Sequence, residues 1–343
     1  MRIPVLILSG FLGSGKTTLL LRLLAAAGKR GLKPGILMNE LGRKDVDGLI
    51  LQESLDLSIS RLLDGCVCCS KKEEMTGKLL ELIDDRPDLI VIELTGVANP
   101  EEVALALSDP QLLRQVKLQR IVTVLDAEHV LAYNSWFQSD QALVRTLRRQ
   151  IETADVLVLN KLDLVSASVR FKVEKALRKQ NATSPIWPAI QSNIDTDLLL
   201  EGIEKTMKAS DARLTPLPGR GVGVSGKRRI LDAVSNRSHE NPSFTRVATL
   251  SFELPSLGQL TSRQIEQFLA LHKEVLLRAK GYFKFSHQTE PFLLQYSGKR
   301  VTWEAAPQYE GVSYLVLIGL DWDEADVIRE LEMTLERNGI RNA

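Results

Sequence analysis

The sequence predicts an α/β protein: a parallel sheet flanked by helices, followed by a smaller C-terminal α+β domain. Short runs of Val, Ile and Leu alternate with helical segments over residues 1–207. These runs do not alternate with polar residues, which is typical of strands buried on both faces of a parallel sheet. After a stretch rich in Gly, Pro and basic residues, the pattern changes to strands that alternate apolar and polar residues.

Composition excludes several classes of protein. The 343 residues are enough for two domains, and 44% hydrophobic with 25% charged residues is typical of a soluble globular chain. A net charge of +1 favours neither nucleic-acid binding nor a polyanion-like role. The apolar runs are far shorter than the ~20 residues of a membrane-spanning helix. The apolar start, residues 4–8, is also too short for a signal peptide. We therefore expect a cytoplasmic protein that binds neither nucleic acid nor a membrane.

The strands and helices of the first domain are predicted in order. Five strands are expected, ending at Leu8, Met38, Ile92, Leu125 and Leu159. One helix is expected over residues 16–27, ending at Gly28, because glycine is common just after a helix. Another follows Asn99, where a capping residue precedes a proline and two acids. This alternation predicts three layers joined by right-handed crossovers.

The predicted domains are residues 1–207, a linker over 208–243, and a second domain over 244–343. The linker has no sustained period and carries a basic cluster that we interpret as solvated. In the second domain we expect helices over 261–280 and 323–337, a turn at Ser297-Gly298, and strands over 246–254, 281–286, 292–296, 301–305 and 314–320.

The segment from Gly10 to Thr17 fits the phosphate-binding pattern G-x-x-x-x-G-K-[ST], between a predicted strand and a predicted helix. Glycines allow the backbone to wrap around phosphate oxygens, and the helix N-terminus adds positive potential. Lys16 should bridge the β- and γ-phosphates, and the Thr17 hydroxyl should bind Mg²⁺. The expected nucleotide contacts are Gly10, Gly13, Ser14, Gly15, Lys16, Thr17 and Thr18. These features predict a P-loop NTPase fold.

The choice of nucleotide is predicted by Asn160-Lys161-Leu162-Asp163, directly after an apolar strand. Asp163 offers two acceptors to the ring N–H and exocyclic amine of guanine, whereas adenine has no donors there. Asn160 would brace the loop, and the stem of Lys161 would cover the base. The expected ligand is GTP. A polar strand end that caps the next helix is the structural alternative, and an ATP-dependent kinase-like enzyme is the functional one.

The strand that ends at Ile92 is followed by Glu93-Leu94-Thr95-Gly96. GTPases usually have Asp-x-x-Gly here; the acid binds Mg²⁺ through water, and the glycine amide senses the γ-phosphate. Glu93, being longer, can still reach the Mg²⁺ shell or hold the attacking water. The alternative for Glu93 is an ordinary strand-end charge.

The three cysteines of the chain are clustered at Cys66, Cys68 and Cys69. A disulfide framework would need an even number and wide spacing. Thiolates select Zn²⁺ or Cu(I), and Co²⁺ is chemically reasonable. Three thiolates leave a fourth tetrahedral position open, which suits a transferable metal. Buried inert cysteines and a redox switch are the alternatives.

Taken together and in order, these motifs resemble the CobW family of P-loop GTPases, which are metal chaperones and metal-insertion proteins. The resemblance is carried by GFLGSGKTT, Asn39-Glu40 with Gly42, GCVCC, ELTG and NKLD, and in the second domain by VLLRAKGYF and YLVLIGLDWDE. It implies that the three cysteines bind the cargo metal and that Glu40 lies near the γ-phosphate and Mg²⁺. His129 would offer a further metal contact; an ordinary polar residue between strand and helix is the alternative.

Two features depart from the family pattern. Arg43 and Met38 stand where many members carry accessory acids, so those ligands are missing or shifted to Asp45 or Asp47. The four histidines are scattered, whereas many members have a His-rich loop. Both features weaken any match to a particular member's metal geometry.

The sequence thus predicts a Mg²⁺-dependent GTPase with Lys16, Glu93 and Glu40 as catalytic residues. It would carry a transition metal, Zn²⁺ first and Co²⁺ next, to an unidentified client metalloprotein in a nucleotide-gated way. One alternative is a dedicated insertase, such as a nitrile hydratase activator or a cobalamin-synthesis accessory protein. Another is a GTP-dependent metal or redox sensor. Homo-oligomerisation is left open.

Overall fold

The computed structural model divides the chain into two units. The first consists of residues 1–204 and 236–249, and the second of 205–235 and 250–343. The structure describes residues 2–39, 58–62, 70–96, 98–134, 141–205, 233–235, 246–254, 260–286, 288–297 and 299–336. Across these residues, no helix has both the length and the apolar character needed to cross a membrane.

The first unit is built on a seven-stranded, wholly parallel sheet in the order β3-β2-β4-β1-β5-β6-β7. Its strands are β1 (Ile3–Ser9), β2 (Pro34–Asn39), β3 (Ser58–Leu62), β4 (Leu89–Glu93), β5 (Val116–Asp126), β6 (Val156–Asn160) and β7 (Ile186–Pro188). All five strands predicted from the apolar runs are confirmed. Because the strands are parallel, their carboxyl ends lie along one edge of the sheet.

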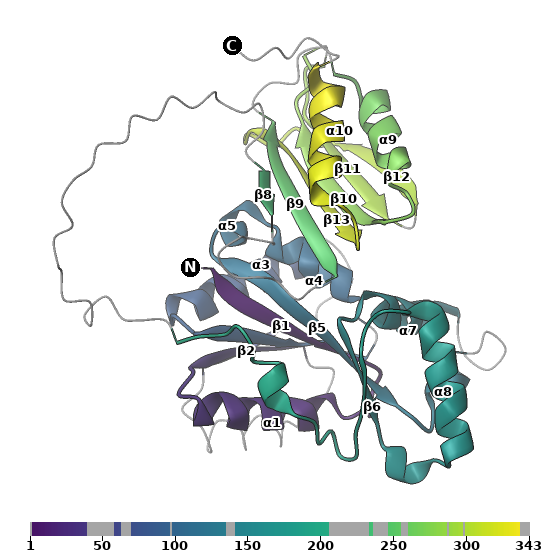
Figure 1. Cartoon of the computed structure of the whole chain (residues 1–343). Helices are drawn as coiled ribbons and strands as arrows, with labels where there is room; N and C mark the ends of the chain where they lie inside the picture. The colour runs from purple at the N-terminus through teal and green to yellow at the C-terminus, as the bar shows by residue number, and fades with distance from the viewer. Residues whose placement is uncertain are drawn as a thin grey trace, which may run out of the picture. The chain divides into compact units, whose positions relative to one another are not determined.

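Helices cover both faces of this sheet (Figure 1). They are α1 (Lys16–Lys29), α3 (Ser70–Asp84), α4 (Pro100–Leu107), α5 (Pro110–Leu113), α6 (Val130–Tyr133), α7 (Gln141–Thr153) and α8 (Ala167–Gln180), with short 3₁₀ turns η1 (Leu162–Leu164) and η2 (Thr196–Leu198). Leu20 of α1 and Val158 of β6 belong to the core on one face. Ile151 of α7, Leu177 of α8 and Leu157 of β6 belong to the core on the other. Consecutive residues of β6 therefore enter opposite cores, and the predicted three-layer α/β fold is confirmed.

The end of α1 differs from the prediction. The helix continues through Gly28 to Lys29, and Gly31, with φ +66°, is the residue that stops it. The Leu32 amide donates to the Ala27 carbonyl at 3.0 Å, and the Gly31 amide donates to the Gly28 carbonyl at 2.9 Å. These are the two bonds of a Schellman motif, which requires a left-handed residue just after the helix. The predicted end of the helix was wrong by two residues, Ala27 instead of Lys29, because two glycines stand close together and only Gly31 has the positive φ.

The sequence did not predict β3, β7 or the first half of β5. The β7 strand has only three residues, and it lies at the edge of the sheet beside β6. The first half of β5 contains Lys117, Gln119 and Arg120, which interrupt the apolar pattern although all three side chains are buried. Pairing with β1 from Ile3 onwards, rather than local composition, extends this strand.

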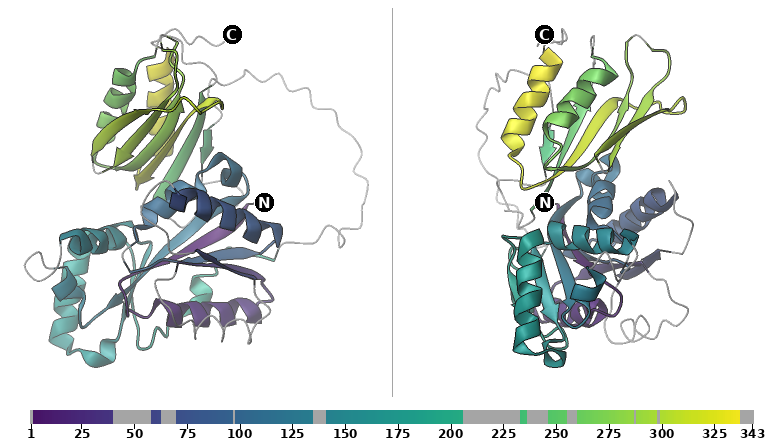
Figure 2. Two further views of the ribbon diagram at one scale, coloured as in Figure 1. Left: turned by 180° about the vertical axis from the view of Figure 1, so that it is seen from behind. Right: turned by 90° about the vertical axis from the view of Figure 1, so that its right-hand side faces the viewer.

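The second unit is a six-stranded sheet in the order β12-β11-β10-β13-β9-β8, with two helices on one face (Figure 2). Its elements are β8 (Ala233–Ser235), β9 (Val247–Leu254), α9 (Ser262–Leu271), β10 (Leu276–Phe283), β11 (Phe292–Ser297), β12 (Arg300–Ala305), β13 (Ser313–Leu320) and α10 (Glu324–Glu336). The short strand β8 lies inside the range predicted as linker, where it pairs with β9. The predicted α+β class is confirmed. Gly298 of the predicted turn lies outside the described residues.

The helix predicted over 261–280 was wrong in its second half. The helix α9 ends at Leu271, and the chain enters β10 at Leu276. The apolar residues of this stretch fit a helical period, but β10 forms antiparallel ladders with both β11 and β13, for example Ala279 with Tyr296 and with Leu317. Pairing with two distant strands decided the structure here, and apolar periodicity alone could not reveal it.

Candidate functional site

The phosphate-loop segment connects the central strand β1 to α1. Gly10, Gly13 and Gly15 have φ values of +131°, +74° and +107°. A Cβ at Gly10 would lie 2.1 Å from the Val124 carbonyl oxygen, and one at Gly15 would lie 2.4 Å from Nδ2 of Asn160. The loop therefore needs glycine for two reasons, because its backbone is left-handed and because neighbouring strand ends touch it. Thr18 and Gly13 are exposed to solvent, whereas Ser14 is buried.

Lys16 lies inside this loop rather than on the surface. Its side chain is 7% exposed, and Nζ donates to the Phe11 carbonyl at 3.1 Å. Burial lowers the pKa of the Lys16 ammonium, and the nearby Glu93 carboxylate opposes that shift. A buried ammonium surrounded by a glycine loop is a site where an anion would be attracted strongly, because little water competes for the charge.

Thr17 and Glu93 meet although they are 76 residues apart in the sequence. The Thr17 hydroxyl donates to Oε1 of Glu93 at 2.9 Å. Glu93 ends β4, pairs in register with Leu8 of β1, and is 8% exposed. One hydroxyl and one carboxylate side by side are the hard oxygen ligands that Mg²⁺ prefers. The donor set therefore fits Mg²⁺.

Gly96 approaches the phosphate loop directly. A Cβ at this position would lie 2.5 Å from the Leu12 backbone nitrogen, so no other residue fits without a shift. The Glu-x-x-Gly segment predicted from the sequence is thus brought against the loop at both of its fixed residues: Glu93 contacts Thr17, and Gly96 contacts Leu12.

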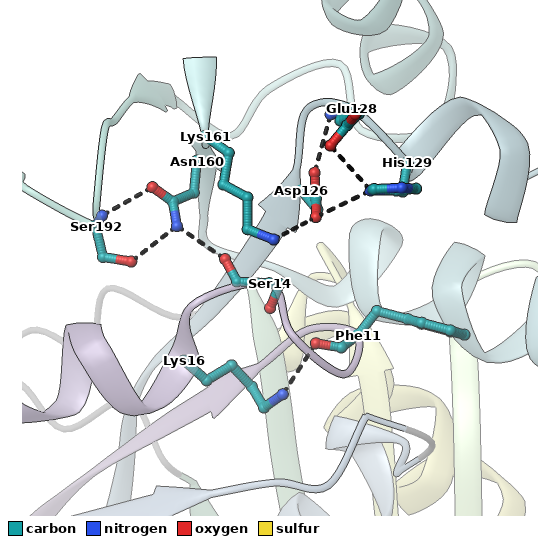
Figure 3. Close-up of polar contacts among 9 residues, drawn as sticks. All are labelled: Phe11, Ser14, Lys16, Asp126, Glu128, His129, Asn160, Lys161 and Ser192. Carbon is teal, nitrogen blue, oxygen red and sulfur yellow. Dashed lines mark hydrogen bonds and ion pairs between the residues drawn. The ribbon is translucent and has the colours of Figure 1, made fainter. Parts of the chain in front are cut away.

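Asn160 joins the phosphate loop to a third segment (Figure 3). Its Nδ2 donates to the Ser14 carbonyl at 2.8 Å and to Oγ of Ser192 at 3.1 Å. The Ser192 amide donates to Oδ1 of Asn160 at 2.8 Å, and the Ser192 hydroxyl donates to the Gly15 carbonyl at 2.9 Å. Asn160 and Ser192 are buried, so this network braces the loop without help from solvent.

Lys161 lies beside this network in a left-handed conformation, with φ +61°. Its Nζ donates to Oδ2 of Asp126, the last residue of β5, at 2.7 Å (Figure 3). Burial raises the pKa of Asp126, but hydrogen bonds from Lys161, the Glu128 amide and His129 outweigh burial, so the net pKa is lowered. Asp126 is therefore ionised at neutral pH and fixes the position of the Lys161 ammonium. Asp163, in η1, is exposed to solvent.

His129 is half-exposed at the start of α6. Its Nδ1 lies 3.2 Å from Oδ2 of Asp126 and 3.6 Å from Oε2 of Glu128. One ligand atom from each of these three residues lies within 4.8 Å of the others, a spacing that suits a metal ion. The His129 ring also stacks on Tyr133, which in turn stacks on Phe11 of the phosphate loop.

Sequence reasoning missed two residues of this site. Asp126 stands at the carboxyl end of a parallel strand, and that position was a usable signal. Ser192 follows Gln191, and both have a positive φ, at 53° and 52°, in a loop with no local pattern. No sequence signal identified Ser192.

Some predicted residues lie outside the described part of the chain. Glu40, with the neighbouring Arg43, Asp45 and Asp47, falls between residues 40 and 57, and the cysteines Cys66, Cys68 and Cys69 fall between 63 and 69.

Comparisons with known proteins give the family. The profile described as the CobW/HypB/UreG nucleotide-binding domain matches residues 4–188, and that of the cobalamin synthesis protein cobW C-terminal domain matches 250–335. The zinc chaperone CobW of Sinorhizobium sp. is 27% identical over 362 residues, covering 95% of each chain. The zinc chaperone YjiA of Escherichia coli is 31% identical over 204 residues, covering 57% of this chain and 60% of the relative.

The crystal structure of Zn(II)-bound YjiA GTPase from Escherichia coli aligns with a TM-score of 0.46 at 21% identity, over 97% of this chain and 99% of that one. The nucleotide-binding profile alone spans more than half of the 343 residues. The chain therefore belongs to the CobW/HypB/UreG family, and it is a nucleotide-binding GTPase.

Proposed function

We propose that this chain is a Mg²⁺-dependent GTPase that carries a transition metal, Zn²⁺ in the first place, and delivers it to a client metalloprotein in a nucleotide-gated way. The observation that carries the proposal is the contact between Thr17 and Glu93 beside the buried Lys16 ammonium. It supports a site for phosphate and a divalent ion. The metal half of the proposal is supported by the clustered cysteines and by relatives named zinc chaperones.

In this proposal the phosphate loop holds the triphosphate through its backbone amides, and Lys16 neutralises the β- and γ-phosphates. Thr17 and Glu93 hold Mg²⁺, which, when bound, offsets charge on the phosphates. Gly96 presents its amide to the γ-phosphate, and Glu40 acts near the same group. Glu93 also orients the attacking water, since it combines an acceptor oxygen with a buried position.

Base recognition is assigned to the strand end of β6. Asn160 braces the phosphate loop through Ser14 and Ser192, so that loop and base site form one rigid unit. The Lys161 stem covers the purine while Asp126 holds its ammonium. Asp163 is exposed to solvent, available to accept hydrogen bonds from the ring N–H and amine of guanine.

The cargo metal is assigned to Cys66, Cys68 and Cys69, with Zn²⁺ preferred and Co²⁺ next. His129, with its carboxylate neighbours, is proposed as a further contact during transfer. Coupling between metal and nucleotide must be reciprocal, so if Mg-GTP tightens metal binding, the metal tightens Mg-GTP binding by the same factor.

A metal titration tests the proposal. Reduced protein is titrated with Zn²⁺ and Co²⁺ in three states: without nucleotide, with Mg-GDP, and with a non-hydrolysable Mg-GTP analogue. We expect tight one-to-one binding that depends on the analogue, with thiolate-to-Co²⁺ absorption that is lost in Cys68→Ser. His129→Gln is the comparison variant. It should keep the thiolate-to-Co²⁺ absorption, because that band arises from cysteine thiolates and His129 supplies none. Weak binding that is indifferent to nucleotide would contradict the chaperone proposal and favour a redox or structural role for the cysteines.

A further inference from the structure

We propose that Gln150, on α7, is a positioning residue that holds the segment after β4 ready for the γ-phosphate, and so favours GTP over GDP. The inference rests on the proposed function, because it assigns Gly96 to the γ-phosphate. No local motif surrounds Gln150, which lies 54 residues from Gly96 in the sequence.

The amide of Gln150 spans from the helix to this segment. Its Nε2 donates to the Ala98 carbonyl at 2.9 Å and to the Gly96 carbonyl at 3.2 Å. The side chain is fully buried. Two carbonyl acceptors determine which end of the amide faces them, because Oε1 would be repelled there. The backbone carbonyl of Gln150 accepts a hydrogen bond from the Thr123 hydroxyl of β5 at 2.9 Å, so the residue is fixed to the sheet as well.

Gly96 is held on two sides. On one side its Cα faces the phosphate loop so closely that a Cβ would lie 2.5 Å from the Leu12 nitrogen. On the other side its carbonyl is held by Gln150. Glycine loses more conformational freedom on ordering than any other residue, so an unheld Gly96 would have to be ordered by the ligand itself. Gln150 removes that cost before the nucleotide arrives.

The residue next to Gln150 secures the other end of the same segment. Nε of Arg149 lies 3.3 Å from Oε1 of Glu101, which is 3% exposed in the first turn of α4. Consecutive residues of α7 therefore hold the backbone just after Gly96 and the helix that follows it. The helix α7 acts as one support for the whole connection from β4 to α4.

This placement predicts a selective effect. The γ-phosphate is the part of GTP that GDP lacks, and Gly96 is the residue assigned to it. In the part of the chain that the structure describes, the hydrogen bonds of Lys16, Thr17, Asn160 and Lys161 go to residues other than Gln150. Loss of one or two buried hydrogen bonds should weaken binding of the triphosphate by about tenfold, while the diphosphate, held by the unchanged loop, keeps its affinity.

The first test replaces the amide by a side chain of similar shape that has no donor, Gln150→Met. The matched control is Asn181→Leu. Nδ2 of Asn181 also donates to two backbone carbonyls, those of Ile151 at 2.8 Å and Ala154 at 3.0 Å, and the side chain is equally buried. Both variants should lower the melting temperature, because both remove hydrogen bonds to backbone carbonyls. Asn181→Leu should lower it further, because Oδ1 of Asn181 also accepts the Ser184 amide at 3.0 Å and Nη1 of Arg246 at 2.8 Å. Affinity for GDP and for a non-hydrolysable GTP analogue is measured in both.

We expect Gln150→Met to keep GDP affinity within about twofold and to lose about tenfold toward the analogue, whereas Asn181→Leu keeps the wild-type ratio. Equal loss of both nucleotides in Gln150→Met, or an unchanged ratio, would overturn the inference while leaving the proposed function intact. Failure of the wild-type protein to bind either nucleotide would instead overturn the proposed function.

A second measurement uses the wild-type protein, so it stands even if Gln150→Met does not fold. The side-chain amide protons of Gln150 are followed by NMR with GDP and with the analogue. We expect slow solvent exchange in both states, because the same two carbonyls are held throughout. Rapid exchange with the analogue bound would show that the contact is released by the γ-phosphate, and preorganisation would be wrong.

Discussion

Lys16 shows a conflict between stability and binding in a single residue. Its side chain is 7% exposed, and burial lowers the pKa of its ammonium against the opposing effect of Glu93. A buried cation whose main neighbours are a carbonyl and a single carboxylate is unfavourable to the folded chain. That cost is recovered only when an anion binds, so the residue serves the ligand rather than the fold.

We expect Lys16→Met to abolish nucleotide binding without lowering the stability of the nucleotide-free protein, since Met keeps the apolar volume and removes the buried charge. Thermal unfolding with and without Mg-GDP checks this result. The wild type should gain several degrees with GDP, and the variant should gain none. Lys29→Met, at the exposed end of α1, is the control and should still respond to GDP. A variant that remains stabilised by GDP would show that Lys16 is not the phosphate ligand.

We expect the preference for guanine over other purine bases to depend on Asp163. The carboxylate is exposed and separate from the Asn160 network, so exchanging it for an amide should leave the phosphate loop intact. In Asp163→Asn we expect affinity for GTP to fall by about 10-fold or more. Affinity for XTP should rise, because xanthine has a carbonyl where guanine has an amine and the new amide can donate to that carbonyl. Competition binding with GTP, XTP and ATP measures it. Unchanged preference for GTP would place base recognition elsewhere.

At the scale of elements, the end of α1 contains two glycines, Gly28 and Gly31, whose backbone conformations differ. Gly28 is exposed within the helix, and a Cβ there would meet nothing within 4 Å. Gly31 is equally open but has φ +66°. The difference between them is therefore backbone conformation, not space.

We expect Gly28→Ala to stabilise the protein by about 0.5–1 kcal/mol, because alanine has the higher helix propensity. Gly31→Ala should destabilise it by about 1 kcal/mol, because a left-handed conformation is unfavourable for a residue with a Cβ. Urea unfolding of the two variants beside the wild type measures both changes. The same sign for both substitutions would contradict the Schellman ending of α1.

At the scale of the whole molecule, the first unit is discontinuous in sequence. Residues 236–249 belong with residues 1–204, and Arg246 anchors the returning chain. Its amide donates to Oδ1 of Asp155, and Nη1 donates to Oδ1 of Asn181 at 2.8 Å. Asp155 is buried and also accepts the Ile121 amide of β5 at 2.6 Å. A residue far along the chain thus completes the hydrogen bonding of the first unit.

We expect Arg246→Ala to destabilise the first unit by roughly 1–2 kcal/mol, the cost of charged hydrogen bonds to buried acceptors. Calorimetry of the full chain with and without Mg-GDP identifies the unfolding transition whose midpoint temperature the ligand raises. The midpoint temperature of that transition should be lower in the variant. Arg170→Ala is the control, because it breaks only a solvent-accessible ion pair with Glu174. It should lower the free energy of unfolding by only about a few tenths of a kcal/mol. If Arg246→Ala leaves the GDP-sensitive transition unchanged, the Arg246 side chain does not anchor the chain to that unit.

The sequence by itself determined the five central strands, the phosphate loop between β1 and α1, and the motifs at the ends of β4 and β6. Each rests on a local signal: an uninterrupted apolar run, or glycines and polar residues at fixed spacing just after it. Parallel strands then bring those motifs to one edge, so contacts such as Thr17 with Glu93 follow once the fold class is known.

Tertiary structure alone decided what depends on distant partners. Residues 276–280 became strand rather than helix because β11 and β13 pair with them. The polar first half of β5 was extended by pairing with β1. Ser192 and Gln150 join the site through contacts across 32 and 54 residues. No local pattern encodes such contacts, because their stability comes from hydrogen bonds that exist only after the chain has packed.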